Sequence, residues 1–151
     1  MPTISLAYAT NQDAVALAQI SQRAFASDLL CGAPGDGGPP GYDSPAWQAS
    51  AMQSATYFKI LVEGELAGGA IVYAQRQGRY YLGRVFLDPA MHRQGIGLAV
   101  MQLIFAHFPD AHRWALETPP WNTRTRNFYQ RLGFQIVKET EEDLFFEKVM
   151  G

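Results

Sequence analysis

Two hydrophobic patterns alternate along the chain. Apolar residues three or four positions apart predict amphipathic helices, and short runs rich in β-branched and aromatic residues predict strands. Strands are expected at residues 3–8, 57–62, 67–73, 79–87, 113–118, 134–138 and 144–149, and helices at about 14–27, 44–54, 95–108 and 122–132. This β-α-α-β-β-β-α-β-α-β-β order predicts a single α/β domain over residues 1–151.

Several of these elements carry signals at their ends. Thr10-Asn11-Gln12-Asp13 has the form of a capping box before the first helix. Ser44-Pro45 offers an N-cap residue followed by a proline at the first helical position. Gly133 follows the last predicted helix, where a C′ glycine is common.

Residues 28–43 form a long segment without a periodic pattern. They contain five glycines and three prolines. Loops of this length inside a compact domain are often functional. We therefore expect this segment to lie over the functional site.

Composition excludes several classes of protein. The formal net charge is −2 and no Lys/Arg run is present, so a nucleic-acid partner is not expected. No apolar run is long enough to span a bilayer and no signal peptide is visible, so we expect a cytoplasmic protein without a membrane partner. The single cysteine, Cys31, excludes an internal disulfide and a CxxC metal site, and no metal is expected.

The segment from Leu87 to Gly97 has the form of an anion-binding turn. A strand ends at Leu87-Asp88-Pro89, and Gly95-Ile96-Gly97 opens a helix. The first N–H groups of a helix lack internal acceptors and lie at the positive end of its dipole, and glycines let phosphate oxygens approach. Taken alone, a Gly-x-Gly turn of this kind is more often a glycine-rich helix start that binds nothing.

Two other phosphate-binding motifs do not fit this spacing. No Gly-Lys-Ser/Thr sequence is present, which excludes a nucleotide-triphosphate P-loop. The residue three positions after Gly97 is Val100 rather than glycine, which disfavours a dinucleotide-binding fold. A different phosphate-binding domain remains an alternative.

Two segments resemble the GNAT (Gcn5-related N-acetyltransferase) superfamily. Residues 92–97, His-Arg-Gln-Gly-Ile-Gly, resemble its pyrophosphate motif Arg/Gln-x-x-Gly-x-Gly/Ala, with His92 in the Arg/Gln position. Residues 122–134 resemble its Asn-x-x-Ala-x-x-x-Tyr-x-x-x-Gly-Phe helix, with Thr125 in place of alanine. Gly97 and Asn122 are 25 positions apart, with one predicted helix and one predicted strand between the two motifs, and the two motifs together indicate an acyl-CoA site.

This resemblance implies a fold and a cofactor. The fold is a mixed, mostly antiparallel sheet with helices on both faces and a splay between the two central strands. The cofactor is acetyl-CoA, whose pantetheine arm would pair with the edge of the strand at 85–87, where backbone N–H groups would polarise the thioester carbonyl. The implied cofactor-binding residues are Val85, Phe86, Leu87, His92, Arg93, Gln94, Gly95, Ile96, Gly97, Asn122 and Tyr129.

Acyl transfer from a thioester to an amine needs an acid and a base. Tyr129 is the candidate acid, because a group with a pKa near 10 can protonate a thiolate whose pKa is about 8.5; a core role is the alternative. Glu117 is the candidate base, acting through water, unless it pairs with Arg84 on the neighbouring strand. Asn122 is expected to cap its helix, to contact the cofactor, or both.

The resemblance implies transfer of an acetyl group to a primary amine by direct attack in a ternary complex. The loop at 28–43 favours a small-molecule acceptor. Acetylation of a protein N-terminus or lysine, and a catalytically silent acyl-CoA-binding module, remain alternatives, and a homodimer is an option because dimers are common in the superfamily. The residues expected to contact the acceptor are Tyr42, Trp47, Arg84 and Trp121.

Overall fold

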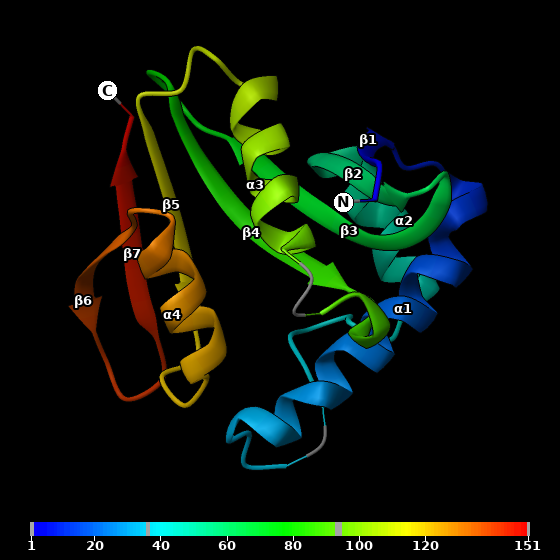
Figure 1. Ribbon diagram of the computed structural model, residues 1–151, viewed down its shortest axis with the longest axis horizontal. Coiled ribbons are helices and arrows are strands. Elements are labelled where there is room, and N and C mark those ends of the chain that lie inside the picture. Colours follow the sequence, from blue (N-terminus) through cyan, green and yellow to red (C-terminus); the bar gives the residue numbers. More distant parts are fainter. Residues whose placement is uncertain (1, 36, 93–94, 151) are drawn as a thin grey trace.

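The central feature of the fold is one seven-stranded sheet in the order β1-β2-β3-β4-β5-β7-β6 (Figure 1). The computed structural model describes residues 2–35, 37–92 and 95–150. Neighbouring strands are antiparallel except β4 and β5, which are parallel. The strands are β1 (Ile4–Tyr8), β2 (Thr56–Val62), β3 (Glu65–Ala74), β4 (Arg79–Leu87), β5 (Arg113–Thr118), β6 (Gln135–Glu139) and β7 (Leu144–Val149).

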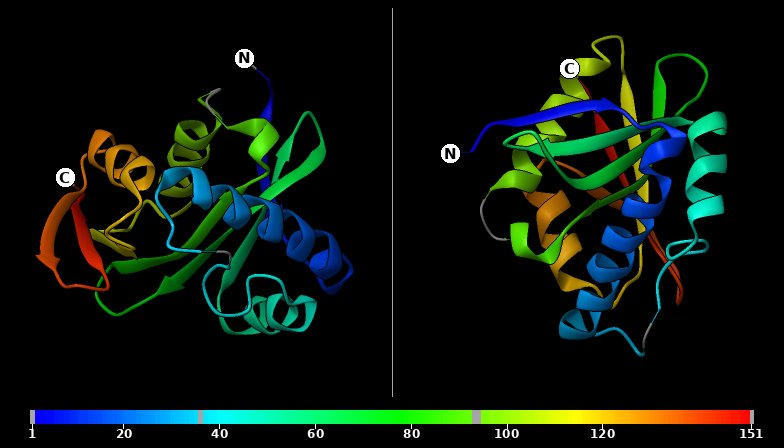
Figure 2. Two further views of the ribbon diagram at one scale, coloured as in Figure 1. Left: turned by 90° about the horizontal axis from the view of Figure 1, so that it is seen from below. Right: turned by 90° about the vertical axis from the view of Figure 1, so that its right-hand side faces the viewer.

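Helices cover both faces of this sheet. On one face, Leu17 and Ile20 in α1 and Ala51 in α2 pack against Ile71 and Phe86 of the sheet. On the other face lie α3 and α4, and Figure 2 shows α2 and α3 on opposite sides of the sheet. The α-helices in the described residues are α1 (Ala14–Ala26), α2 (Pro45–Ser54), α3 (Ile96–His107) and α4 (Thr123–Arg131). Short 3₁₀ helices are η1 (Asn11–Asp13), η2 (Ser27–Cys31) and η3 (Pro89–Met91).

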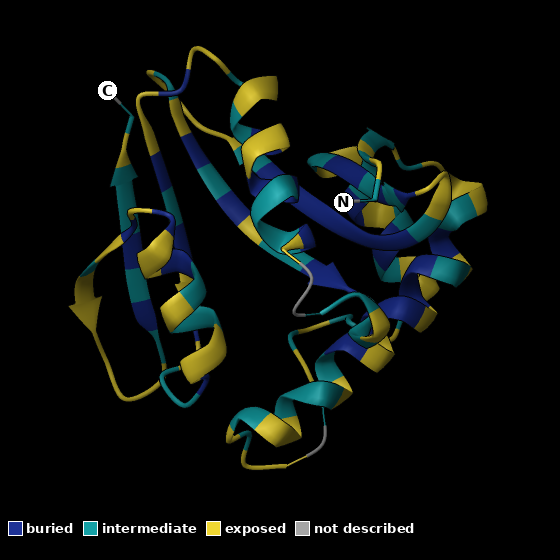
Figure 3. Ribbon diagram, in the orientation of Figure 1, coloured by how far each residue is buried: buried dark blue, intermediate teal, exposed yellow. Residues whose placement is uncertain are grey.

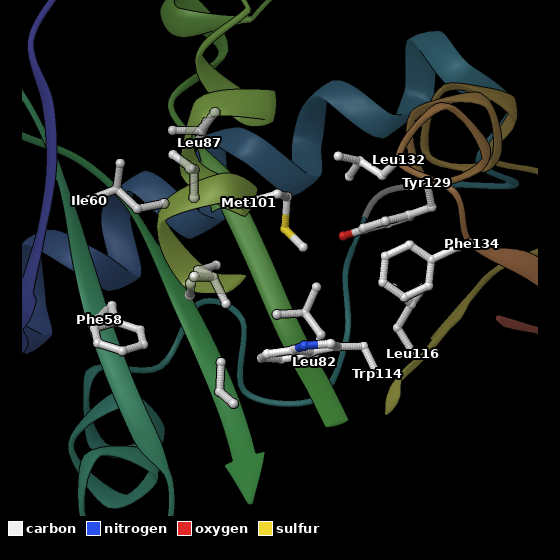
Figure 4. Packing of buried hydrophobic residues seen from close by; sticks show 14 of the residues in the cluster. Phe58, Ile60, Leu82, Leu87, Met101, Trp114, Leu116, Tyr129, Leu132 and Phe134 are labelled. Carbon is white, nitrogen blue, oxygen red and sulfur yellow. The ribbon is translucent and has the colours of Figure 1, made fainter. Parts of the chain in front are cut away.

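The larger part of the core lies between the sheet and the helices α3 and α4. Trp114 of β5 is fully buried, and its ring stacks on Tyr80 and meets Phe105 edge-on. Figure 4 shows Trp114, Leu82 and Leu116 gathered in this layer. Buried positions follow the central strands, whereas the outward side of α3 is exposed (Figure 3).

The two central strands, β4 and β5, diverge. Their pairing covers only Arg79–Tyr81 against Arg113–Ala115, although β4 continues to Leu87. Near the point of divergence Gly83 is an extra residue in β4, because Ile71 of β3 pairs with Arg84 and the next residue pairs with Leu82. Within the described residues, the β5 side of Val85–Leu87 therefore has no partner strand. This is the splay that the family resemblance implies.

The fold predicted from the sequence is confirmed in its order of elements, its helices on both faces and its mostly antiparallel sheet. The capping residues predicted at the ends of the helices are also found in the structure. The backbone N–H of Thr10 donates to Asp13 Oδ2 at 2.9 Å, and Ser44 Oγ accepts from the N–H of Trp47 at 3.1 Å. Gly133 ends α4 with a φ of 95°, a conformation that favours glycine.

The boundary of the loop predicted at 28–43 was wrong at its start. The chain does not leave the helical path after α1 but continues through η2 to Gly32, whose φ is 100°. A 3₁₀ turn this short has no buried stripe to reveal it, and Leu30 is 90% exposed. Among the described residues, no helix combines the length and the apolarity needed to cross a membrane.

Candidate active site

The divergence of β4 and β5 opens a cleft of about 1320 Å³. Its walls come from β4, β5, the N-terminal part of α3, α4 and the loop between η2 and α2. Glycines and prolines of that loop line the cleft, so the loop lies against the site as predicted. The cleft brings together eleven of the residues predicted from the sequence: Arg84, Val85, Phe86, Leu87, His92, Gly95, Gly97, Glu117, Trp121, Asn122 and Tyr129.

The turn at Gly95-Ile96-Gly97, called here the glycine turn, presents backbone donors to one end of this cleft. Gly95 is the N-cap of α3 and has a φ of 73°, a conformation that L side chains rarely adopt. The first helical hydrogen bond runs from Ala99 N to Gly95 O at 3.2 Å. The N–H groups of Ile96, Gly97 and Leu98 therefore have no helical acceptor, and they lie where the helix dipole favours an anion.

The two glycines of the turn have different structural roles. A Cβ on Gly97 would lie 3.1 Å from the ring of Phe128, so this glycine lets α3 and α4 approach each other. The side chain of Ile96 is buried in the core and does not line the cleft, so only its backbone is available to a ligand. The predicted contacts Arg93 and Gln94 lie outside the described residues.

His92 links the glycine turn to α4. Its Nε2 lies 3.1 Å from Leu87 O, and its Nδ1 lies 3.3 Å from Arg124 Nη1. Arg124 also pairs with Asp28 of η2 at 3.1 Å. This chain of contacts connects η2, the first turn of α4 and the glycine turn around the cleft.

Asp28 and Arg124 are site residues that sequence reasoning missed. Both line the cleft. Burial raises the pKa of Asp28, and the neighbouring Arg124 and a hydrogen bond from Asn122 oppose that rise. No local motif reveals the pair, because 96 positions separate the two residues in the sequence.

Asn122 caps α4. Its Oδ1 accepts from Thr125 N at 3.2 Å, and its Nδ2 donates to Asp28 Oδ1 at 3.4 Å. The side chain is almost fully buried, yet it forms part of the cleft wall. The capping role predicted from the sequence is confirmed, and the predicted cofactor contact stays a prediction.

Tyr129 belongs both to the core and to the cleft wall. It is 8% exposed and its ring contacts Phe134 and Phe146. Figure 4 shows it reaching from α4 toward the side of α3 that carries Met101. Its hydroxyl has no hydrogen-bond partner among the described residues. Burial raises the pKa of Tyr129, so the group is protonated at neutral pH.

Glu117 does not pair with Arg84, so that alternative was wrong. The two strands have already diverged at this level, and Glu117 instead contacts the hydroxyl of Tyr81. Burial raises the pKa of Tyr81, and the adjacent Glu117 carboxylate raises it further. Glu117 itself is exposed and faces the cleft, where a water-mediated base must lie.

Two of the four predicted acceptor contacts lie behind the cleft wall rather than on it. Trp47 stacks beneath the guanidinium of Arg84, with Arg84 Cζ 4.1 Å from the ring centroid. Tyr42 packs edge-on against Phe25, with centroids 6.1 Å apart. Neither lines the cleft, because their rings are used to pack the loop onto α1 and α2. Trp121 and Arg84 do line it.

Gln48 of α2 was also missed by sequence reasoning, and its role is to support the loop rather than to line the cleft. It is fully buried, accepts a hydrogen bond from the hydroxyl of Tyr57, and donates from Nε2 to Gly41 O at 3.2 Å. A lone glutamine in a short helix gives no pattern to detect. In the folded chain it fastens the end of the glycine-rich loop to the sheet.

Comparison with known proteins shows the family. A sequence model of the acetyltransferase (GNAT) family matches residues 9–134, which include both the glycine turn and α4. The chain belongs to the acetyltransferase (GNAT) family. It is an acyltransferase, and enzymes of this family use acetyl-CoA.

The chain is similar in sequence to one bacterial protein and in fold to several solved structures. The uncharacterized protein YrkN of Bacillus subtilis (strain 168) is 31% identical over 144 residues, which cover 91% of this chain and 76% of YrkN. An acetyltransferase from Thermus thermophilus has a TM-score of 0.79 at 17% identity, covering 98% of this chain and 97% of that one. The PaiA N-acetyltransferase of Thermoplasma acidophilum, solved in complex with coenzyme A, has a TM-score of 0.77 at 14% identity, covering 98% and 99%.

Proposed function

We propose that this protein transfers the acetyl group of acetyl-CoA to the primary amine of a small molecule, by direct attack within one ternary complex. The observation that carries the proposal is the continuous cleft between β4 and β5. It runs from the free N–H groups at the start of α3 to the exposed carboxylate of Glu117. A donor and an acceptor can therefore meet inside it.

The cleft has the features needed to hold acetyl-CoA. The N–H groups of Ile96, Gly97 and Leu98 offer a cradle for the pyrophosphate, with Arg124 close by through His92. The unpaired β5 side of Val85–Leu87 offers backbone groups to an extended pantetheine arm, as a partner strand would use them. Acetyl-CoA supplies the acetyl group as a thioester with a good leaving group.

Three groups of the chain have separate roles in the proposed acetyl transfer: the backbone of β4, Tyr129 and Glu117. Backbone N–H groups of β4 stabilise the negative charge that develops on the carbonyl oxygen, a contribution of about 3 kcal/mol for each donor. Tyr129 holds a proton that it donates to the leaving sulfur, and Glu117 accepts the proton lost by the amine, through water. Burial raises the pKa of Tyr129 and keeps its proton in place, and Glu117 is exposed, so water can reach its carboxyl group.

A small acceptor is favoured over a protein by the loop between η2 and α2. Residues 33–35 and 37–40 of this loop line the cleft, and Gln48 and Arg84 fasten its far end. A polypeptide acceptor needs an open groove, and here the loop closes part of that path. PaiA is an N-acetyltransferase of the same fold.

Thiol release from acetyl-CoA tests the proposal. We expect a broad panel of small primary amines to contain members that raise thiol release above the rate of hydrolysis, with one acetylated amine formed for each thiol. Peptides with a free N-terminus or an internal lysine serve as the comparison. Faster transfer to the peptides would support a protein acceptor, and binding of CoA without transfer to any amine would support a silent acyl-CoA-binding module.

A further inference from the structure

Arg84 is a half-buried cation that the proposed chemistry does not use. Its guanidinium stacks on the ring of Trp47 at 4.1 Å, and Nη2 donates to Pro40 O at 3.0 Å. Nη1 is buried and has no hydrogen-bond partner in the part of the chain that the structure describes. The residue lines the cleft, so the guanidinium lies at the cleft wall with one of its nitrogens buried and unpartnered.

No carboxylate of the described residues neutralises Arg84. The ion pairs found there join Arg23 to Asp88, Lys59 to Asp13, Arg113 to Glu147 and Arg124 to Asp28. Removing a guanidinium from water without a counter-charge is unfavourable. Burial accordingly lowers the pKa of Arg84.

The surrounding residues hold this unpaired cation in one orientation. Trp47 supports its flat face and Pro40 fixes one edge. Gln48 in turn holds the carbonyl of Gly41, the residue after Pro40, at 3.2 Å, and a Cβ on Gly41 would collide with the ring of Trp47. Three elements thus keep Nη1 in place at the cleft, which is the expected arrangement of a ligand-binding arginine rather than of a solvated one.

Arg84 lies on the acceptor side of the proposed reaction. It directly precedes Val85, but the two side chains lie on opposite faces of β4: Val85 packs against the core under α3, whereas Arg84 contacts α2 and its loop. The glycine turn that would hold acetyl-CoA lies on the α3 side. Glu117 and Asp143 also line the cleft, so an acceptor meets carboxylates as well as the Arg84 guanidinium.

We propose that Arg84 binds a carboxylate of the acceptor, which makes the acceptor an amino acid or a related amino carboxylate. This inference rests on the proposed function and names the class of its substrate. The ammonium group of such a zwitterion faces Glu117, and its carboxylate accepts from the Arg84 guanidinium. A polyamine or a simple alkyl amine would leave Arg84 without a counter-charge.

Binding to the CoA-saturated protein tests this proposal without relying on turnover. Titration calorimetry compares the standard amino acids with their carboxamides, which keep the amine and side chain but lack the negative charge. We expect the amino acid that binds most tightly to exceed its carboxamide by about tenfold or more, because a hydrogen bond between charged groups is lost in the carboxamide.

Variants show whether Arg84 is responsible. Arg84→Gln is expected to remove the preference for the acid, and Arg84→Lys to restore part of it, because lysine keeps the charge but not the planar fork. Arg131→Gln removes another cleft-lining arginine, one that is exposed, and is expected to keep the preference. Unchanged affinity for CoA in Arg84→Gln shows that the variant is folded.

Several results would overturn the inference. They are equal binding of acids and carboxamides, tighter binding of O-phosphoethanolamine than of any amino acid, binding of no panel member, or an acid preference that survives Arg84→Gln. The proposed function fails separately: if the wild-type protein does not bind CoA, or transfers acetyl groups to no amine of any kind, the donor site is at fault rather than Arg84.

Discussion

At the scale of single residues, the two proposed proton-transfer groups lie in opposite environments. Tyr129 is 8% exposed within a layer of aromatic rings, and Glu117 is exposed on a strand edge that has lost its neighbour. An acid that must stay protonated benefits from burial, and a base that must stay charged benefits from water. Both residue types were predicted from the sequence, but only the structure shows this difference in exposure.

Replacing Tyr129 by phenylalanine is expected to lower kcat by about 100-fold or more, the usual contribution of a general acid. CoA affinity and the free energy of unfolding should change little, because the hydroxyl has no partner among the described residues. Because burial raises the pKa of Tyr129 above its usual 10.0, the wild-type rate should show no alkaline loss from this group below that pH. Steady-state kinetics from about pH 6 to about pH 10 measure both effects.

Tyr80→Phe is the matched control for that variant. In the wild type, the hydroxyl of Tyr80 donates to the carboxylate of Asp110 at 2.9 Å, outside the cleft. We expect normal kcat and a lower free energy of unfolding, the reverse of the result for Tyr129→Phe. Equal kcat in wild type and Tyr129→Phe would remove Tyr129 from the mechanism.

Replacing Glu117 by glutamine is expected to lower kcat/KM about 100-fold at pH 7, where about one aliphatic amine in a thousand is neutral. The defect should shrink as the pH approaches about 10.4, because the amine then loses its proton without a base. Glu147→Gln is the control, since Glu147 pairs with Arg113 at 3.5 Å and does not line the cleft. A defect that does not change with pH would argue for a structural role.

At the scale of secondary-structure elements, the sequence predicted what local rules determine. Capping by Thr10 and Ser44, the C′ glycine at 133 and the strand of Arg79–Leu87 depend on neighbouring residues, and each is found in the structure. The contacts of Arg124 with Asp28 and of Trp47 with Arg84 join segments that are distant in the sequence. Periodicity and spacing carry no information about such pairs.

The conformation of Gly95 leads to a prediction about the start of α3. Gly95→Ala is expected to lower the free energy of unfolding by about 1–2 kcal/mol, because an L residue is strained at a φ of 73°. CoA affinity should fall as well, since the strain displaces the N–H groups of the first turn. Urea denaturation and calorimetry measure the two effects.

Gly35→Ala separates strain from the mere addition of a methyl group. A Cβ at Gly35 has no neighbour within 4 Å, and its φ is not positive. We expect the free energy of unfolding of Gly35→Ala to equal that of the wild type or to exceed it slightly, because alanine reduces the entropy of the unfolded chain. If Gly95→Ala were no less stable than Gly35→Ala, the description of the turn would be wrong.

The ion pair between Arg23 of α1 and Asp88 leads to a prediction about pH. Hydrogen bonding to Arg23 holds the pKa of Asp88 below its usual 3.8. A lowered carboxylate pKa contributes stability above the unfolded pKa and loses it as the pH falls through the folded value. Asp88→Asn should therefore cost about 0.5–1 kcal/mol at pH 7 and almost nothing at about pH 2.

A double-mutant cycle identifies the source of that effect. Asp88→Asn, Arg23→Gln and the double variant are compared by urea denaturation at both pH values. The coupling free energy should be present at neutral pH and absent at the acidic pH. A coupling of the same size at both pH values would contradict the assignment.

At the scale of the whole molecule, the site exists because a continuous sheet divides in its middle. β1 to β4 carry α1 and α2 on one face, and β5 to β7 extend the sheet beyond the splay (Figure 1). The splay itself entered the prediction through the family resemblance, because no feature of β4 or β5 read alone shows where two strands separate. The position of Arg84 in the cleft depends on contacts of β4 with α2 and with the loop before it, and it could not be predicted for that reason.

We propose that the cleft between β4 and β5 binds acetyl-CoA rather than phosphates in general. Titration calorimetry with CoA and with ATP tests it most directly, because both ligands carry an adenine nucleotide with a polyphosphate and only CoA carries the pantetheine arm. We predict saturable binding of one CoA per chain and much weaker binding of ATP. Equal affinities for the two, or no binding of CoA, would contradict the account.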